Sequence, residues 1–68
     1  MKKGEYAKML RKLDYRGSVT LFDENDNPVT RVDSDGFGRY SVYSLWPCHC
    51  SCIAFEISLH ELEKIMVD

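Results

Sequence analysis

The fold is decided by residues 29–46, which read VTRVDSDGFGRYSVYSLW. Branched or aromatic residues alternate with polar ones on both sides of Asp35-Gly36. Asp-Gly between two such runs is a strong sequence signal for a β-hairpin. We therefore predict antiparallel strands at 29–32 and 39–46, joined by this turn.

Two further strands extend the predicted sheet. A dense cluster of turn-forming residues at 23–28 separates the first hairpin strand from an earlier β-prone run at 18–22. Pro47 cannot donate to a strand ladder and ends the strand before it. The alternation resumes at 53–57, where we expect Ile53, Phe55 and Ile57 on one face.

Helical periodicity replaces the two-residue alternation at both ends of the chain. At the N-terminal end we predict a helix over 5–14, ended by Gly17, because four apolar residues fall at helical spacing. These residues are Tyr6, Met9, Leu10 and Leu13. Ser58 and Glu61 have the spacing of a capping box and predict the start of a second helix. Its apolar stripe consists of Leu59, Leu62, Ile65 and Met66.

The predicted fold class is α+β, in one small domain over residues 1–68. An antiparallel four-stranded β-meander carries the N-terminal and the C-terminal helix on one face, in the order α-β-β-β-β-α. Helices this short are marginal in water unless they pack on the sheet. The expected core is Met9, Leu10, Leu13, Val19, Leu21, Tyr40, Val42, Ile53, Phe55, Ile57, Leu62 and Ile65.

Length and composition narrow the function classes. A chain of 68 residues has little room for a concave pocket, so we expect no enzyme, no catalytic residue and no cofactor. No apolar stretch approaches a membrane span, and Met1–Glu5 is not followed by the apolar core of a signal peptide. Three clustered cysteines make a poor disulfide framework, which predicts reduced thiols and a cytoplasmic location.

The cysteine cluster gives one metal hypothesis. Thiolates and imidazoles are natural zinc ligands. The candidates are Cys48, His49, Cys50, Cys52 and the distant His60. Structural zinc sites usually draw their ligands from two separate pairs, and here the second pair is missing. A small zinc-binding module around 48–52 is therefore our third interpretation, and packed free thiols are the simpler account.

The preferred interpretation is a small non-enzymatic binding protein. It would block or modulate a larger protein or protein complex, as inhibitors encoded by phages and mobile elements do against defence systems. The expected contact surface is the helix-free sheet face with Arg39, Tyr43 and Leu45, residue types among which Tyr and Arg are enriched at interface hot spots. The basic side of the first helix flanks it in this hypothesis, with Lys8, Arg11 and Lys12.

The uneven charge of the chain supports an alternative interpretation. Residues 1–18 hold six basic and two acidic residues, a net charge of +4, whereas residues 19–68 hold three basic and nine acidic residues, a net charge of −6. The basic first helix could contact phosphates in a nucleic-acid-binding accessory protein. The acidic total charge of −2 argues against this alternative. A homodimer through an edge strand or the open face is also compatible with the sequence, and no membrane partner is expected.

Overall fold

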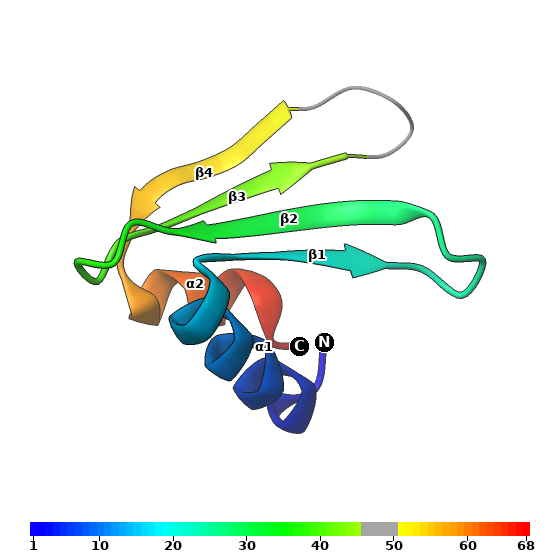
Figure 1. Ribbon diagram of the computed structural model, residues 1–68, viewed down its shortest axis with the longest axis horizontal. Helices are drawn as coiled ribbons and strands as arrows, with labels where there is room; N and C mark the ends of the chain where they lie inside the picture. The colour runs from blue at the N-terminus through cyan, green and yellow to red at the C-terminus, as the bar shows by residue number, and fades with distance from the viewer. Residues whose placement is uncertain (46–50) are drawn as a thin grey trace.

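The computed structural model describes residues 1–45 and 51–68 and confirms the predicted α+β fold. Four strands form one antiparallel sheet in the order β1-β2-β3-β4, so each strand pairs with its neighbour in the chain. Both helices lie on the same side of this sheet (Figure 1). The elements are α1 (Lys3–Arg16), β1 (Ser18–Phe22), β2 (Pro28–Ser34), β3 (Tyr40–Ser44), β4 (Ser51–Ile57) and α2 (Leu59–Met66).

Local signals in the sequence set the helix ends. Gly17 ends α1 in the left-handed conformation at φ +80°, and its N–H donates to the carbonyl of Leu13 at 2.8 Å. Ser58 is the N-cap of α2, and its hydroxyl accepts from the Glu61 N–H at 3.3 Å. The Glu61 carboxylate completes the cap by accepting from the Ser58 hydroxyl, also at 3.3 Å.

The turn between β1 and β2 is organised by Asp23. Its carboxylate accepts backbone N–H bonds from Asn27 at 2.9 Å and Asn25 at 2.8 Å. The Asn27 bond is the main reason that the pKa of the Asp23 carboxyl lies below its ordinary value. The dense Asp/Asn cluster thus forms the predicted turn, and the Asp23 side chain stabilises it by bonding the backbone of the turn.

The core lies between the sheet and the two helices. Leu13, Val32, Val42 and Leu62 are almost completely buried, and Tyr6, Met9 and Tyr40 complete the cluster. Five of the expected core residues belong to it, and Leu10, Val19, Leu21 and Ile57 pack against it. Burial also raises the pKa of Tyr6, with the Glu63 carboxylate adding to the effect. Tyr6 and Val32 were missing from the predicted core.

Three of the expected core residues are on the surface. Ile53 is 55% exposed, Phe55 is 64% exposed and Ile65 is 45% exposed, so the prediction was wrong for all three. Ile65 lies on α2, whose buried side is centred on Leu62. The two β4 residues have a different cause, which is the pairing of that strand.

Irregular pairing reverses the alternation of β4. Tyr40 pairs with Ile57 and Val42 pairs with Ala54, so Phe55 and Glu56 together face the single residue Ser41. Glu56 takes φ +53°, a left-handed conformation found at β-bulges. A second register shift follows between Val42 and Tyr43. Ala54 therefore points to the core where Ile53 and Phe55 were expected to point.

The two ends of the chain lie together beneath the sheet (Figure 1). The Met1 amino group donates to the Met66 carbonyl at 2.8 Å, and the Asp68 N–H donates to the Met1 carbonyl at 3.1 Å. Tyr6 Oη adds a long bond of 3.5 Å to the Leu59 carbonyl. These contacts connect α2 to α1, so both helices belong to one layer.

Candidate functional site

The helix-free side of the sheet carries a row of paired residues. Thr20 pairs with Arg31, Arg31 with Tyr43, and Tyr43 with Cys52, so the row crosses all four strands. Thr20, Arg31 and Tyr43 each neighbour a residue whose side chain enters or packs on the core, and Cys52 shares their face because it pairs with Tyr43. The row therefore lies on the side opposite the helices, which we call the open face.

An ion pair fixes one side chain of this row. Arg31 Nε donates to Asp33 Oδ1 at 2.8 Å. The two residues lie two positions apart on β2, so their side chains are on the same face. Both side chains keep solvent contact, so the pair contributes at most about 1 kcal/mol. Its main effect is to compensate the Arg31 charge. Arg39 makes no ion pair with the residues that the structure describes.

Arg39, Tyr43 and Phe55 surround one shallow depression of about 250 Å³ on the open face. Asp33, Ser41 and Glu56 line it as well. The structure thus brings together two of the predicted contact residues and adds an aromatic ring that we expected in the core. Leu45 is half-buried and lies past the end of β3, outside the residues that line the depression.

The β2–β3 turn holds Arg39 in position. The Asp35 carboxylate accepts N–H bonds from Phe37 at 2.7 Å and from Arg39 at 3.1 Å. Gly36 and Gly38 both have positive φ, which lets the connection close within a few residues. The turn also leaves the Phe37 ring 91% exposed.

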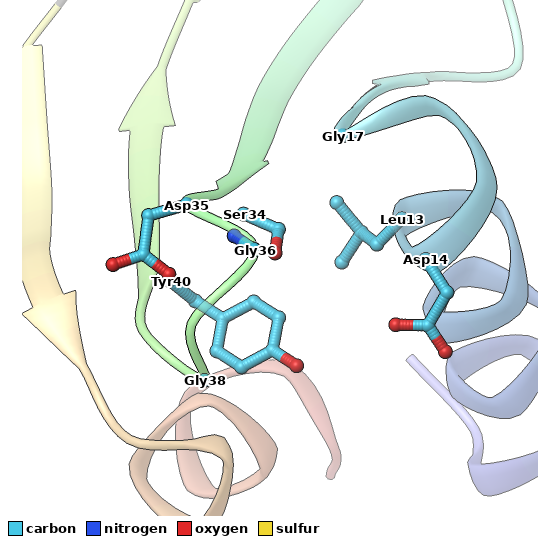
Figure 2. Close-up of a pocket in the computed structure, with 8 residues that line it drawn as sticks. All are labelled: Leu13, Asp14, Gly17, Ser34, Asp35, Gly36, Gly38 and Tyr40. Carbon is cyan, nitrogen blue, oxygen red and sulfur yellow. Dashed lines mark hydrogen bonds between the residues drawn. The ribbon is translucent and has the colours of Figure 1, made fainter.

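A second hollow, of about 380 Å³, lies between this turn and the end of α1 (Figure 2). Figure 2 shows the Tyr40 ring beside the turn, with its hydroxyl directed toward α1. Asp14 and Asp35 supply carboxylates, but Asp35 is committed to the turn amides. The Ser34 hydroxyl in this lining accepts from the Gly36 N–H at 3.2 Å, another contact within the turn.

The basic residues of α1 form a separate surface. Lys8, Lys12 and Arg16 follow one another at four-residue spacing and line the groove between α1 and β1. We call these three residues the basic row. Arg11 lines another depression with Lys12, Tyr15 and Arg16. Because α1 lies in the helix layer, Lys8, Arg11 and Lys12 are not brought together with Arg39 and Tyr43.

Most of the zinc hypothesis falls outside the described residues, since Cys48, His49 and Cys50 lie at 46–50. Cys52 is exposed, and its thiol donates to the Ala54 carbonyl at 3.4 Å. His60 is exposed in the first turn of α2. Over 1–45 and 51–68, no three metal-ligating side chains come together. The zinc hypothesis stays a prediction, and metal analysis of protein purified without chelator would test it.

Sequence reasoning missed Phe55 and Tyr15 as surface residues. Phe55 depends on the β4 bulge, and the sequence gives no local mark of that bulge. Tyr15 is 89% exposed and follows directly from the α1 periodicity, so the stripe could have placed it. Neither described helix has the length and apolar character needed to cross a membrane.

Comparisons with protein-family models, curated proteins and solved structures find no match to this chain.

Proposed function

We propose that the protein is a non-enzymatic binding protein that blocks or modulates a larger protein or protein complex through its open face. The observation that carries the proposal is the cluster of Arg39, Tyr43 and Phe55 around one depression. Arg and aromatic residues dominate interface energetics because they bury large areas and still satisfy polar groups.

The apolar exposure of β4 supports a contact role. Ile53 and Phe55 remain more than half exposed on β4, although the neighbouring strand β3 contributes Tyr40 and Val42 to the core. Single exposed apolar residues are ordinary, but Phe55 lines the same depression as Arg39 and Tyr43. Burying this surface against a partner would remove apolar area from water, worth about 25 cal/mol per Å² before the costs of association.

The inhibitor class fits these features best. Such a protein acts by occupying a surface, and it therefore needs a stable platform and a contact patch rather than a reaction centre. Small acidic inhibitors from phages or mobile elements share this general profile, an analogy of size and class. The proposal places Arg39 and Tyr43 at the centre of the contact, with Leu45 at its edge.

A comparison of two double variants tests the proposal. Arg39→Ala with Tyr43→Ala should reduce capture of the partner from a lysate of the source cells at least about tenfold. The control is Arg11→Ala with Tyr15→Ala, which removes the same residue types from exposed positions on α1. It should leave capture unchanged, and both proteins should keep the wild-type thermal transition. Unfolding of the first variant, or loss of capture only in the control, would contradict the open-face site.

A nucleic-acid-binding accessory protein is the second candidate. Arg11, Lys12 and Arg16 surround a depression together with the highly exposed Tyr15, and basic side chains around an aromatic ring suit single-stranded nucleic acid. Retention of the protein on immobilised DNA and RNA, measured across salt concentrations, tests this candidate. Phosphate contacts predict retention that falls steeply with salt, and no retention at low salt removes the candidate.

A further inference from the structure

β1 lies at one edge of the sheet. β1 pairs with β2 alone, so its other side has no ladder in the described structure. The Ser34 N–H donates to the Gly17 carbonyl at 2.8 Å, so Gly17 and Ser34 are a hydrogen-bonded pair. Hydrogen-bonded and non-hydrogen-bonded pairs alternate along an antiparallel ladder, and this fixes the pattern for the rest of β1. Val19 and Leu21 are bonded to β2, whereas Ser18 and Thr20 direct their N–H and C=O groups to the free edge.

The residues of β1 itself lack the usual protection of an edge strand. Natural edge strands are commonly blocked by lysine, proline or an inward-pointing charge, and β1 reads SVTLF. The register shift between Leu21 and Phe22 affects only its far end. Ser18–Leu21 therefore presents a short regular template for another strand.

The basic row runs beside this edge. Lys8 and Lys12 line the groove with Thr20 and Leu21, and Lys12 and Arg16 line it with Ser18 and Thr20. All three side chains are exposed. Ion pairs in 1–45 and 51–68 involve other residues, so the row has no such partner there, although Glu5 also lines the groove near Lys8.

The spacing of the row matches that of a strand. Residues four apart on a helix are separated by about 6 Å, and alternate residues on a strand by about 6.6 Å. We propose that the β1 edge binds an extended peptide segment in which acidic residues occur at alternate positions. The peptide backbone pairs with Ser18 and Thr20, and its carboxylates face the basic row.

Other occupants fit this groove less well. Pairing of β1 with β1 of a second copy would bring two basic rows together, and like charges then repel. A nucleic acid matches the charge but cannot form the alternating N–H and C=O ladder of an added strand. The inference concerns a surface other than the open face and stands whether or not the open face binds.

Synthetic peptides test the inference by isothermal titration with the full chain. The probe is a nonapeptide in which Thr and Glu alternate, and the reference has the same composition with its Glu residues contiguous. The alternating peptide should bind at least about tenfold more tightly, and more tightly than a DNA oligonucleotide of equal charge. Equal binding of both peptides, or stronger binding of the oligonucleotide, would overturn the inference.

Backbone methylation distinguishes strand pairing from charge attraction. Alternate N–H groups of a strand point to opposite edges, so N-methylation of the Glu amides and N-methylation of the Thr amides block opposite sides of the peptide. One methylated peptide should lose binding at least about tenfold and the other should retain it. Equal behaviour of the two peptides would show that no strand is added.

Protein variants locate the peptide. Lys8→Gln, Lys12→Gln and Arg16→Gln combined should weaken binding of the alternating peptide at least about tenfold. Lys2→Gln, Lys3→Gln and Lys64→Gln change the net charge equally, outside the groove, and should weaken it much less. Thr20→Pro removes an edge-facing N–H without touching the β2 ladder and should also abolish binding. Equal effects of the two triple variants would contradict the site.

Discussion

At the scale of single residues, a left-handed backbone conformation is needed at a few positions, and Gly17 is one of them. Gly17 turns the chain from α1 into β1 at φ +80°, and its N–H closes the last turn of the helix. A side chain at this φ is strained even though the space around the Cα is open. The direct passage from helix to edge strand therefore depends on glycine.

Gly17→Ala should lower the free energy of unfolding by about 1 kcal/mol, since alanine resists the left-handed region. Gly4→Ala is the matched control, because Gly4 lies within α1 and without a positive φ. That change should leave stability equal or raise it by up to about 1 kcal/mol through helix propensity. Urea unfolding measures both. Equal stability of wild type and Gly17→Ala would mean that the cap is not needed.

Tyr6 gives the molecule an alkaline pH dependence. Burial raises the pKa of its phenol above the ordinary value of 10.0, so the folded chain holds a proton that the unfolded chain loses. The stability that depends on neutral Tyr6 is present below pH 10 and is lost as the pH rises above it. Tyrosinate absorbance should show a late-titrating group that Tyr6→Phe removes. Late-titrating absorbance that is the same in wild type and in Tyr6→Phe would contradict the assignment to Tyr6.

At the scale of elements, the sequence predicted the parts whose signals are local. The two helices, the Ser58–Glu61 cap and the Asp35-Gly36 hairpin are set by neighbouring residues, and all were confirmed, although Leu59 and Ile65 of the predicted α2 stripe are exposed. The orientation of β4 could not be read in this way. The regular Ile53-x-Phe55-x-Ile57 alternation predicts an inward face, but the pairing of β4 with β3 inserts extra residues and turns Ala54 inward instead.

The reversed face of β4 gives a quantitative expectation. Phe55→Ala should cost no more than about 1 kcal/mol of folding stability, because most of the ring is already in water. Leu62→Ala, at a completely buried position, should cost about 2–5 kcal/mol. Chemical denaturation of the two variants compares them. A Phe55→Ala cost similar to that of Leu62→Ala would restore Phe55 to the core and contradict the bulged register.

At the scale of the whole molecule, the two faces of the sheet differ: both helices cover one face, and the other face is open. A chain of 68 residues buries only about 60% of its unfolded surface, and here both helices serve the same face. Contacts between Met1 and the end of α2 hold the helix layer together. The other face is left with Tyr43, Arg39 and the displaced Phe55.

Only part of the candidate site could be predicted from the sequence. Alternation along one strand was enough to place Arg39 and Tyr43 on a common face, and the structure puts them around one depression. The relation of that face to Lys8, Arg11 and Lys12 depends on how α1 packs, which no local pattern encodes. These helix residues lie in the other layer and line the β1 groove or the depression around Tyr15.

Exposure of the open face in the free protein is the central claim, and paramagnetic relaxation measures it directly. An inert gadolinium chelate dissolved in the sample enhances proton relaxation according to each proton's distance from solvent. The account predicts strong enhancement for the side-chain protons of Ile53 and Phe55 and weak enhancement for the methyl groups of Val32, Val42 and Leu62. Protection of Ile53 and Phe55 equal to that of Val42 would show a covered face and contradict the account.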